Sequence, residues 1–107
     1  MTENPESDAW FEAGGPLAVL RRRLDDLDGQ LVTAMAARLA VCDDIGYLKR
    51  ALGLPMMQPQ RVHDVTERYA RGLLEHGVRG EFGRKLATLI IEEACSRELE
   101  IIAAENS

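Results

Sequence analysis

Residues 16–52 read PLAVLRRRLDDLDGQLVTAMAARLAVCDDIGYLKRAL, and this stretch decides the fold. No proline interrupts it after Pro16, which suits the first turn of a helix. The pattern predicts one helix of about 35 residues, roughly 50 Å long at 1.5 Å per residue. Its apolar residues recur at the spacing of one buried helical face, namely Leu20, Leu24, Leu27, Leu31, Met35, Leu39, Cys42 and Ile45. A rod of this length cannot bury that face against one short chain, so we expect a partner helix from a second copy.

Two medium-length helices are predicted after this rod. A loop over residues 53–58 precedes the second helix, which Pro59 opens and which Gly77 stops after about His76. A third apolar helical pattern covers residues 81–104. Because no strand-like alternation occurs, we predict an all-α fold with one long and two medium helices.

The chain is predicted to hold one helical domain, residues 16–107, behind a flexible leader, residues 1–15. A length of 107 residues suits a single domain. The leader contains Pro, Ser, Asn and a Gly14-Gly15 pair, with Trp10-Phe11 as its apolar anchor. This apolar pair could pack against the helical domain or make no contact with it, and the sequence leaves both alternatives open.

The composition indicates a soluble protein, which we place in the cytoplasm. A formal net charge of −5 disfavours nucleic acid as a partner, since phosphate binding depends on surplus lysine and arginine. No apolar run approaches the roughly 20 residues of a membrane span, and the acidic N-terminus lacks a signal-peptide core. Cys42 and Cys95 lie far apart among apolar helical neighbours, which predicts reduced core thiols and no metal site.

Two long cations, Arg38 and Lys49, interrupt the apolar face of residues 16–52. A cation on such a face is costly unless an anion meets it. They are eleven residues apart, which places them within about 20° of one face and roughly 16 Å apart, so they could grip one small dianion. Arg21, roughly 25 Å from Arg38 along the rod, could reach such a site from the partner chain of an antiparallel dimer. As part of Arg21-Arg22-Arg23, it could equally lie on a solvated face.

Each of the other cations also has an ordinary explanation. Arg38 could form a buried pair with Asp43 or Asp44. Lys49 could extend its ammonium group to solvent. Arg61, on the first turn of the second helix, could be a plain surface arginine. The residues by themselves leave these alternatives open.

Glu98 is a further polar residue on an apolar face. Its neighbours at helical spacing are apolar or small, namely Ile91, Ala94, Cys95 and Ile102. One explanation is a boundary carboxylate paired with a nearby cation, such as Arg97 or Lys85. The other is a buried carboxyl group that stays protonated and donates a hydrogen bond. The chain contains no phosphate loop, nucleophile elbow or zinc motif.

Taken together, these residues resemble the small all-helical chorismate mutases over about residues 16–104. The most specific stretches are LRRRLDDLDGQLVTAMAARLAVCDDIGYLKR at 20–50, PMMQPQRV at 55–62 and LIIEEACSRELE at 89–100. The family carries an arginine near the start of helix one, a second in mid-helix, a Gly-x-x-Lys, and an arginine at the start of helix two. The matching residues in this chain are Arg21, Arg38, Gly46 with Lys49, and Arg61.

The resemblance implies a homodimeric isomerase that acts on a small dianionic substrate. Members form intertwined dimers with two sites, and each site borrows the early arginine, here Arg21, from the other chain. The reaction is a Claisen rearrangement, which turns chorismate into prephenate and needs no metal and no cofactor. By resemblance, Lys49 and Glu98 donate hydrogen bonds to the ether oxygen in the transition state. Arg38 and the partner's Arg21 hold the two carboxylates, with Arg61 nearby.

Four positions depart from the commonest family pattern and concern the choice of substrate. Chorismate-specific members often carry acids where this chain has Gln58 and Val62. Members in general commonly carry a serine at the position of Ala94, and many carry a glutamine at the position of Glu98. The loop with Glu98 looks most like a subgroup that acts on 4-amino-4-deoxychorismate, for antibiotics derived from p-aminophenylalanine. Physical reasoning does not independently favour that substrate, because an ammonium group at C4 would prefer the two missing carboxylates.

Three alternatives to this substrate assignment stay open. The first is a chorismate mutase, and the second is an isochorismate-pyruvate lyase on the same fold. The third is a non-catalytic helical dimer that binds a partner or a metabolite. The cations on the apolar face argue against the non-catalytic dimer, because a protein whose helices only pack together does not need charges there.

Overall fold

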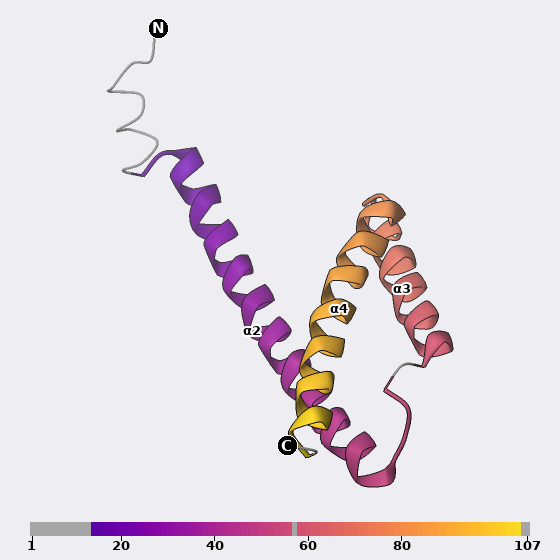
Figure 1. Cartoon of the computed structure of the whole chain (residues 1–107). Helices are drawn as coiled ribbons and strands as arrows, with labels where there is room; N and C mark the ends of the chain where they lie inside the picture. Colours follow the sequence, from indigo (N-terminus) through magenta and orange to yellow (C-terminus); the bar gives the residue numbers. More distant parts are fainter. Residues whose placement is uncertain (1–13, 57, 106–107) are drawn as a thin grey trace, which may run out of the picture. The chain divides into compact units, whose positions relative to one another are not determined.

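A computed structural model describes residues 14–56 and 58–105, and these residues form three helices (Figure 1). The helices are α2, Pro16–Leu52, α3, Pro59–Leu74, and α4, Gly80–Glu105. No strand occurs in this part of the chain, so the predicted all-α fold with one long and two shorter helices is confirmed. The predicted Trp10-Phe11 anchor, like the rest of residues 1–13, lies outside the described residues.

The N-terminal part of α2, up to Arg38, belongs to a first compact unit, and Leu39 begins a second. In the first unit, the leucines of the predicted apolar face are exposed to between 51% and 66%, namely Leu20, Leu24, Leu27 and Leu31. The stripe is therefore present on the helix but is not buried within one chain. None of the helices in the described part of the chain has the length and apolar character that a membrane crossing needs.

The second unit contains the end of α2, which a glycine terminates. Gly53 has a positive φ of 67°, a conformation that side chains other than glycine adopt at a cost. The Leu54 amide donates to the Lys49 carbonyl at 2.9 Å, and the Gly53 amide donates to the Arg50 carbonyl at 3.4 Å. This pair of hydrogen bonds is the Schellman arrangement of a helix C-terminus. It holds the backbone of Lys49 within the final turn of α2.

Proline and glycine also set the bounds of α3, as the sequence predicted. Pro59 occupies the first turn, where its missing N–H is no loss, after the extended cap residue Gln58. The helix ends at Leu74, two residues before the predicted end, and a turn at Gly77 with a φ of 79° follows. There the Val78 amide donates to the Leu73 carbonyl at 2.9 Å, so the C-terminus again forms a Schellman turn.

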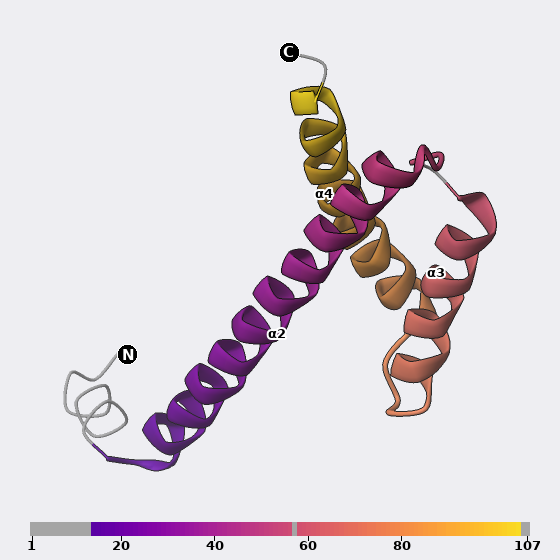
Figure 2. The same cartoon turned by 90° about the horizontal axis from the view of Figure 1, so that it is seen from below.

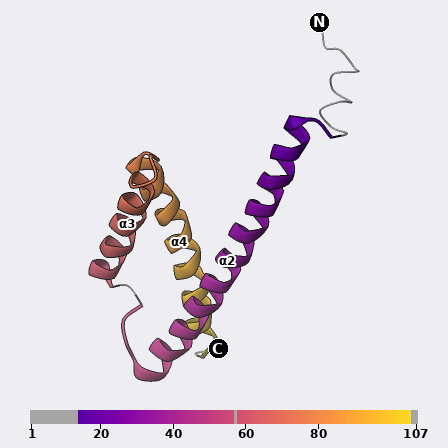
Figure 3. The ribbon, with the colours of Figure 1, turned by 180° about the vertical axis from the view of Figure 1, so that it is seen from behind.

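Helices α3 and α4 lie side by side, joined by a short link (Figures 1 and 3). Gly83 permits this close approach, because a Cβ there would lie 2.8 Å from the Tyr69 carbonyl oxygen. Both helices carry buried apolar side chains, among them Val65 and Ala70 on α3 and Ala87 and Ile90 on α4. On the outside, Arg84 of α4 donates to both carboxylate oxygens of Glu67 on α3, at 3.1 and 3.2 Å.

Candidate functional site

The last turns of α2 cross the C-terminal half of α4 with Gly46 at the contact (Figure 2). A Cβ at Gly46 would lie 3.2 Å from Cγ of Glu98, 3.3 Å from Cδ1 of Ile101 and 3.4 Å from Cα of Glu98. Those distances are tight for a real side chain, so any larger residue at this position would require its neighbours on α4 to shift by a few tenths of an ångström. The Gly-x-x-Lys motif thus places Lys49 one turn after a close helix contact.

The Lys49 ammonium group meets two acceptors at this crossing. Its Nζ donates to Oε1 of Glu98 at 2.8 Å and to the main-chain oxygen of Met56 at 2.6 Å. Both side chains are largely shielded from water, with 13% of Lys49 and 9% of Glu98 exposed. Because an ammonium group has three N–H donors, one donor is left for a third acceptor after these two bonds.

Glu98 is the buried charged residue of α4, and its partner differs from those expected. The sequence suggested Arg97 or Lys85 as its cation, but the structure pairs it with Lys49. Arg97 instead binds Asp43, and Lys85 lies 3.7 Å from Glu81 one turn away on the same helix. The suggestion that Lys49 extends to solvent is likewise wrong, because its ammonium group is held at the helix crossing.

A second ion pair connects α2 and α4 where these helices cross. Arg97 donates from Nε to Oδ1 of Asp43 at 2.9 Å and from Nη2 to Oδ2 at 2.6 Å. These bonds hold the pKa of the Asp43 carboxyl below its usual value and raise the pKa of Arg97. The sequence suggested Asp43 as a partner of Arg38, whereas the structure gives it a two-point contact with Arg97.

A third contact joins α2 to α4 through Arg50, the residue that follows Lys49. The Arg50 guanidinium donates from Nη1 to the Ile101 carbonyl oxygen at 3.0 Å. Its central carbon lies 5.3 Å from the centre of the Tyr47 ring, which is within the range of a cation–π contact. Arg50 and Asp43 therefore hold α4 from positions on either side of Gly46 in α2.

Both cysteines are free thiols in the second unit, and both are half-buried. Burial raises the pKa of the Cys95 thiol, and the nearby charge of Glu98 adds to that effect. The charge of Lys49 acts in the opposite direction. The prediction of free thiols is confirmed, although neither side chain is fully buried. Within residues 14–56 and 58–105, no group of three or more metal-binding side chains gathers.

The remaining predicted site residues are spread over all three helices. Ala94 is buried on α4, one turn before Glu98. Gln58, the cap residue before α3, is exposed, and on α3 itself Arg61 is exposed and Val62 is half-buried. Arg21 and Arg38 belong to the first unit, where Arg21 is exposed and Arg38 is half-buried. The predicted catalytic residues that the second unit brings together are thus Lys49 and Glu98.

Three partners in this site were not predicted from the sequence. The Met56 carbonyl gives no side-chain signal, because every residue has one. Arg97 is a charged residue next to the apolar face that carries Glu98, so a contact of Arg97 could have been sought. The spacing of residues within one helix, however, does not identify which residue of another helix Arg97 contacts. The bond from Arg50 to a helix carbonyl depends on the crossing of two helices and has no sequence signature.

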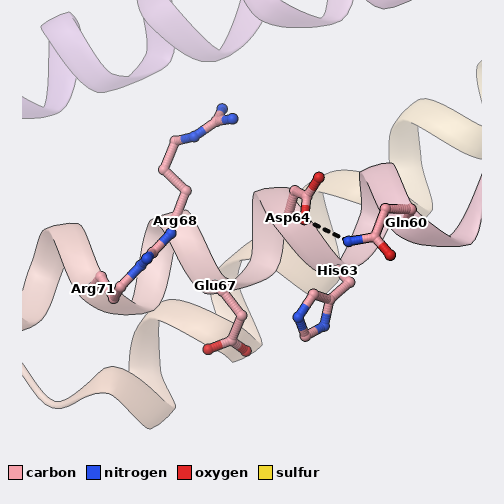
Figure 4. A pocket seen from close by; sticks show the side chains of 6 residues that line it. All are labelled: Gln60, His63, Asp64, Glu67, Arg68 and Arg71. Carbon is pink, nitrogen blue, oxygen red and sulfur yellow. Dashed lines mark hydrogen bonds between the residues drawn. The ribbon is translucent and has the colours of Figure 1, made fainter.

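A shallow hollow of about 510 Å³ lies on one face of α3, apart from Lys49 and Glu98 (Figure 4). Its lining consists of polar and charged side chains, namely Gln60, His63, Asp64, Glu67, Arg68 and Arg71. Two of its carboxylates are engaged, because Gln60 donates to Asp64 at 2.8 Å and Arg84 binds Glu67. This mixed and internally paired surface is typical of the solvated face of a helix.

Comparison with known proteins gives several matches over most of the chain. The family model described as chorismate mutase type II matches residues 20–99. A 4-amino-4-deoxychorismate mutase of Streptomyces pristinaespiralis is 44% identical over 92 residues, which cover 86% of this chain and 71% of the relative. Another 4-amino-4-deoxychorismate mutase, from Streptomyces venezuelae, is 38% identical over 81% of this chain and 84% of its own length. A chorismate mutase of Methanocaldococcus jannaschii is 29% identical over 71% of this chain and 77% of its own length.

Proposed function

The chain belongs to the type II chorismate mutase family, and on this premise we propose that it converts 4-amino-4-deoxychorismate to 4-amino-4-deoxyprephenate. The resemblance seen in the sequence is confirmed at the level of the family. The observation that carries the proposal is the contact between Lys49 and Glu98. These two residues are 49 positions apart, yet their charged groups meet at 2.8 Å in a shielded site.

The chemistry asks the protein to fold a flexible dianion into a reactive shape. In the Claisen rearrangement the ether C–O bond breaks as the new C–C bond forms, and negative charge develops on the ether oxygen. A fixed donor aimed at that oxygen stabilises the transition state more than the ground state. The Lys49 ammonium group suits this role, because two of its donors are bound and the third is available.

Glu98 can serve the reaction in one of two ways. As a carboxylate it accepts from Lys49 and orients the ammonium group, as its 2.8 Å bond in the structure does. As a neutral acid it donates a second hydrogen bond to the ether oxygen. We propose that Glu98 acts at the ether oxygen together with Lys49, supported by its 7% exposure and by its 2.8 Å contact with the ammonium group.

The arginines are proposed to hold the substrate's two carboxylates. Arg38 lies eleven residues before Lys49 on α2, a spacing that in helical register favours one shared face. The partner's Arg21 completes the site across a dimer interface, and Arg61 supplies further positive charge from the first turn of α3. Guanidinium groups suit this task because they bind carboxylates through two parallel hydrogen bonds.

An intertwined homodimer is part of this proposal. Its support is the apolar surface that α2 exposes in a single chain, including Leu31 at 66% and Val32 at 69%. The same unit has a face of mostly small residues, among them Gly29, Ala34 and Ala37, where a partner helix could approach closely. A small domain that leaves this much apolar surface uncovered commonly covers it by oligomerisation.

Substrate choice is proposed from the residues around the ring and from the relatives. The two Streptomyces proteins with the highest identities quoted above are named for 4-amino-4-deoxychorismate. Gln58 and Val62, at the start of α3, put an amide and an apolar side chain at positions where chorismate-specific members often have acids. The Gln58 amide can accept a hydrogen bond from an amine at C4 of the ring.

A substrate panel tests the proposal directly. The purified protein is incubated with 4-amino-4-deoxychorismate, chorismate and isochorismate, and kcat/KM is measured for each. We expect the amino compound to be turned over with the highest kcat/KM, and no pyruvate to be released. Lys49→Ala should lower kcat about 100- to 1,000-fold while leaving the helical content unchanged. Lys85→Ala, which removes an exposed lysine from α4, is the matched control; turnover of none of the three acids would reject the enzyme assignment.

A further inference from the structure

The ion pair between Asp43 and Arg97 lies at the same helix crossing as the Lys49–Glu98 contact. Arg97 directly precedes Glu98 on α4, and Asp43 lies three residues before Gly46 on α2. Its two parallel hydrogen bonds, at 2.9 and 2.6 Å, fix the rotation of the helices as well as their separation. A single bond would fix only the separation.

The Lys49–Glu98 contact cannot by itself hold this crossing during a reaction. When the ammonium group and the carboxyl group turn toward a substrate oxygen, the bond between them must change. The crossing then depends on contacts that do not involve the substrate. In the described part of the second unit, such contacts include the Asp43–Arg97 pair, the bond from Arg50 to the Ile101 carbonyl and the packing on Gly46.

We infer that Asp43 and Arg97 form a positioning pair, which sets the rotation of α4 against α2 and thereby aims Glu98 at the reacting atoms. The catalytic consequence of this inference rests on the proposed function. Neither residue needs to touch the substrate, because both act through the backbone that carries Glu98. A rotation of α4 by about 10° moves side-chain atoms roughly 6 Å from the helix axis by about 1 Å. Misplacement on that scale can reduce a rate about 100-fold.

The ordinary alternative is a surface ion pair that contributes only slightly to stability. Arg97 is 37% exposed and Asp43 is 26% exposed, so breaking their pair should change the thermal midpoint little. A stability role therefore predicts little loss of activity at 25 °C. A positioning role predicts a fall in kcat that the change in stability does not explain.

The Asp43→Asn and Arg97→Gln variants, singly and together, separate these two roles. We expect each single variant to lower kcat about 10-fold with KM changed less than about 3-fold, since the carboxylate-binding arginines stay in place. The double variant should lose no more than either single variant, because both substitutions break the same contact. Glu67→Gln is the matched control, because it breaks a two-point ion pair to Arg84, fourteen residues before Glu98 on α4. It should keep kcat within about 2-fold.

Two results would overturn the inference, namely unchanged kcat in Asp43→Asn or an equal loss in Glu67→Gln. A crystal structure of Asp43→Asn gives a readout that does not depend on turnover. We expect the distance from Lys49 Nζ to Glu98 Oε1 to lengthen from 2.8 Å beyond hydrogen-bonding range, and an unchanged distance would also refute the positioning role. If the wild-type protein turns over no chorismate-type acid, the proposed function fails. The crystal structure then still decides whether the pair positions Glu98.

Discussion

Nζ of Lys49 and Oε1 of Glu98 lie 2.8 Å apart where α2 crosses α4, and both groups are shielded from water. Each residue interrupts an apolar helical face in the sequence, where a charge is costly without a partner. Their meeting explains how both charges are tolerated. It also places a largely shielded ammonium donor directly beside a buried carboxyl group.

Substitution of Gly46 by alanine should disturb this contact directly. The new methyl group would lie 3.2 Å from Cγ of Glu98, so α4 or the Glu98 side chain must move. Overpacking of this kind costs about 1–3 kcal/mol, partly offset by the better helix propensity of alanine. We therefore expect kcat to fall at least about 10-fold with a modest loss of stability, measured by steady-state kinetics and urea unfolding.

Gly72→Ala on α3 is the control for that substitution. Nothing lies within 4 Å of a Cβ at Gly72, so alanine should fit without displacing any neighbour. It should raise stability by a few tenths to about 1 kcal/mol through helix propensity and should leave kcat unchanged. Full activity in Gly46→Ala would show that Glu98 tolerates displacement.

Substitutions at position 98 test the role of Glu98. Glu98→Gln keeps the length of the side chain, and its amide can donate a hydrogen bond to the ether oxygen. Glu98→Ala removes the side-chain hydrogen bond altogether. We expect Glu98→Gln to keep substantial activity and Glu98→Ala to lower kcat about 100-fold, measured by steady-state kinetics. An unchanged kcat in Glu98→Ala would reject the donor role.

Acid conditions should remove the stabilisation that the Glu67–Arg84 pair provides. The hydrogen bonds from Arg84 lower the pKa of Glu67 in the folded chain. Its stabilising effect is therefore fully present above the unfolded-state pKa, about 4.3 for a glutamate, and is lost as the pH falls through the lower folded-state value. The wild-type protein should exceed Glu67→Gln in free energy of unfolding at pH 7, with the difference shrinking toward pH 3, roughly one unit below the ordinary value. A difference that grows with acid would contradict the assigned direction.

Much of this fold could be predicted from the sequence because single residues mark the helix ends. Pro16, Pro59 and Gly77 act locally, and the structure has helices or turns at each of them. Lys49 and Glu98 stood out because each breaks an apolar period. The helix bounds could therefore be predicted because the physics that sets them is local to one helix.

The partners across helices could not be predicted in the same way. The sequence suggested Asp43 as a partner of Arg38, whereas Asp43 binds Arg97, and this pairing depends on how α2 is rotated against α4. That rotation follows from the close packing on Gly46 and from contacts between helices, which no spacing within one helix reveals. The Met56 carbonyl depends on the path of a loop and is equally invisible to side-chain patterns.

The turns at Gly53 and Gly77 have similar backbone geometry but form hydrogen bonds to different helices. Gly53 and Gly77 have φ values of 67° and 79°, and no neighbour lies within 4 Å of a Cβ at either position. Alanine at each site should therefore cost about 1–2 kcal/mol from backbone conformation alone. The two variants should show similar losses in urea unfolding.

Their activities should differ, because only the Gly53 turn holds the backbone of Lys49. The Leu54 amide binds the Lys49 carbonyl at 2.9 Å, whereas the corresponding bond after Gly77 holds Leu73 of α3. We expect Gly53→Ala to lower kcat several-fold at 25 °C, since a displaced final turn moves the ammonium group from its acceptors. Gly77→Ala should keep kcat while losing the same stability. Equal activity losses in the two variants would mean that the turn supports the fold generally and does not aim Lys49.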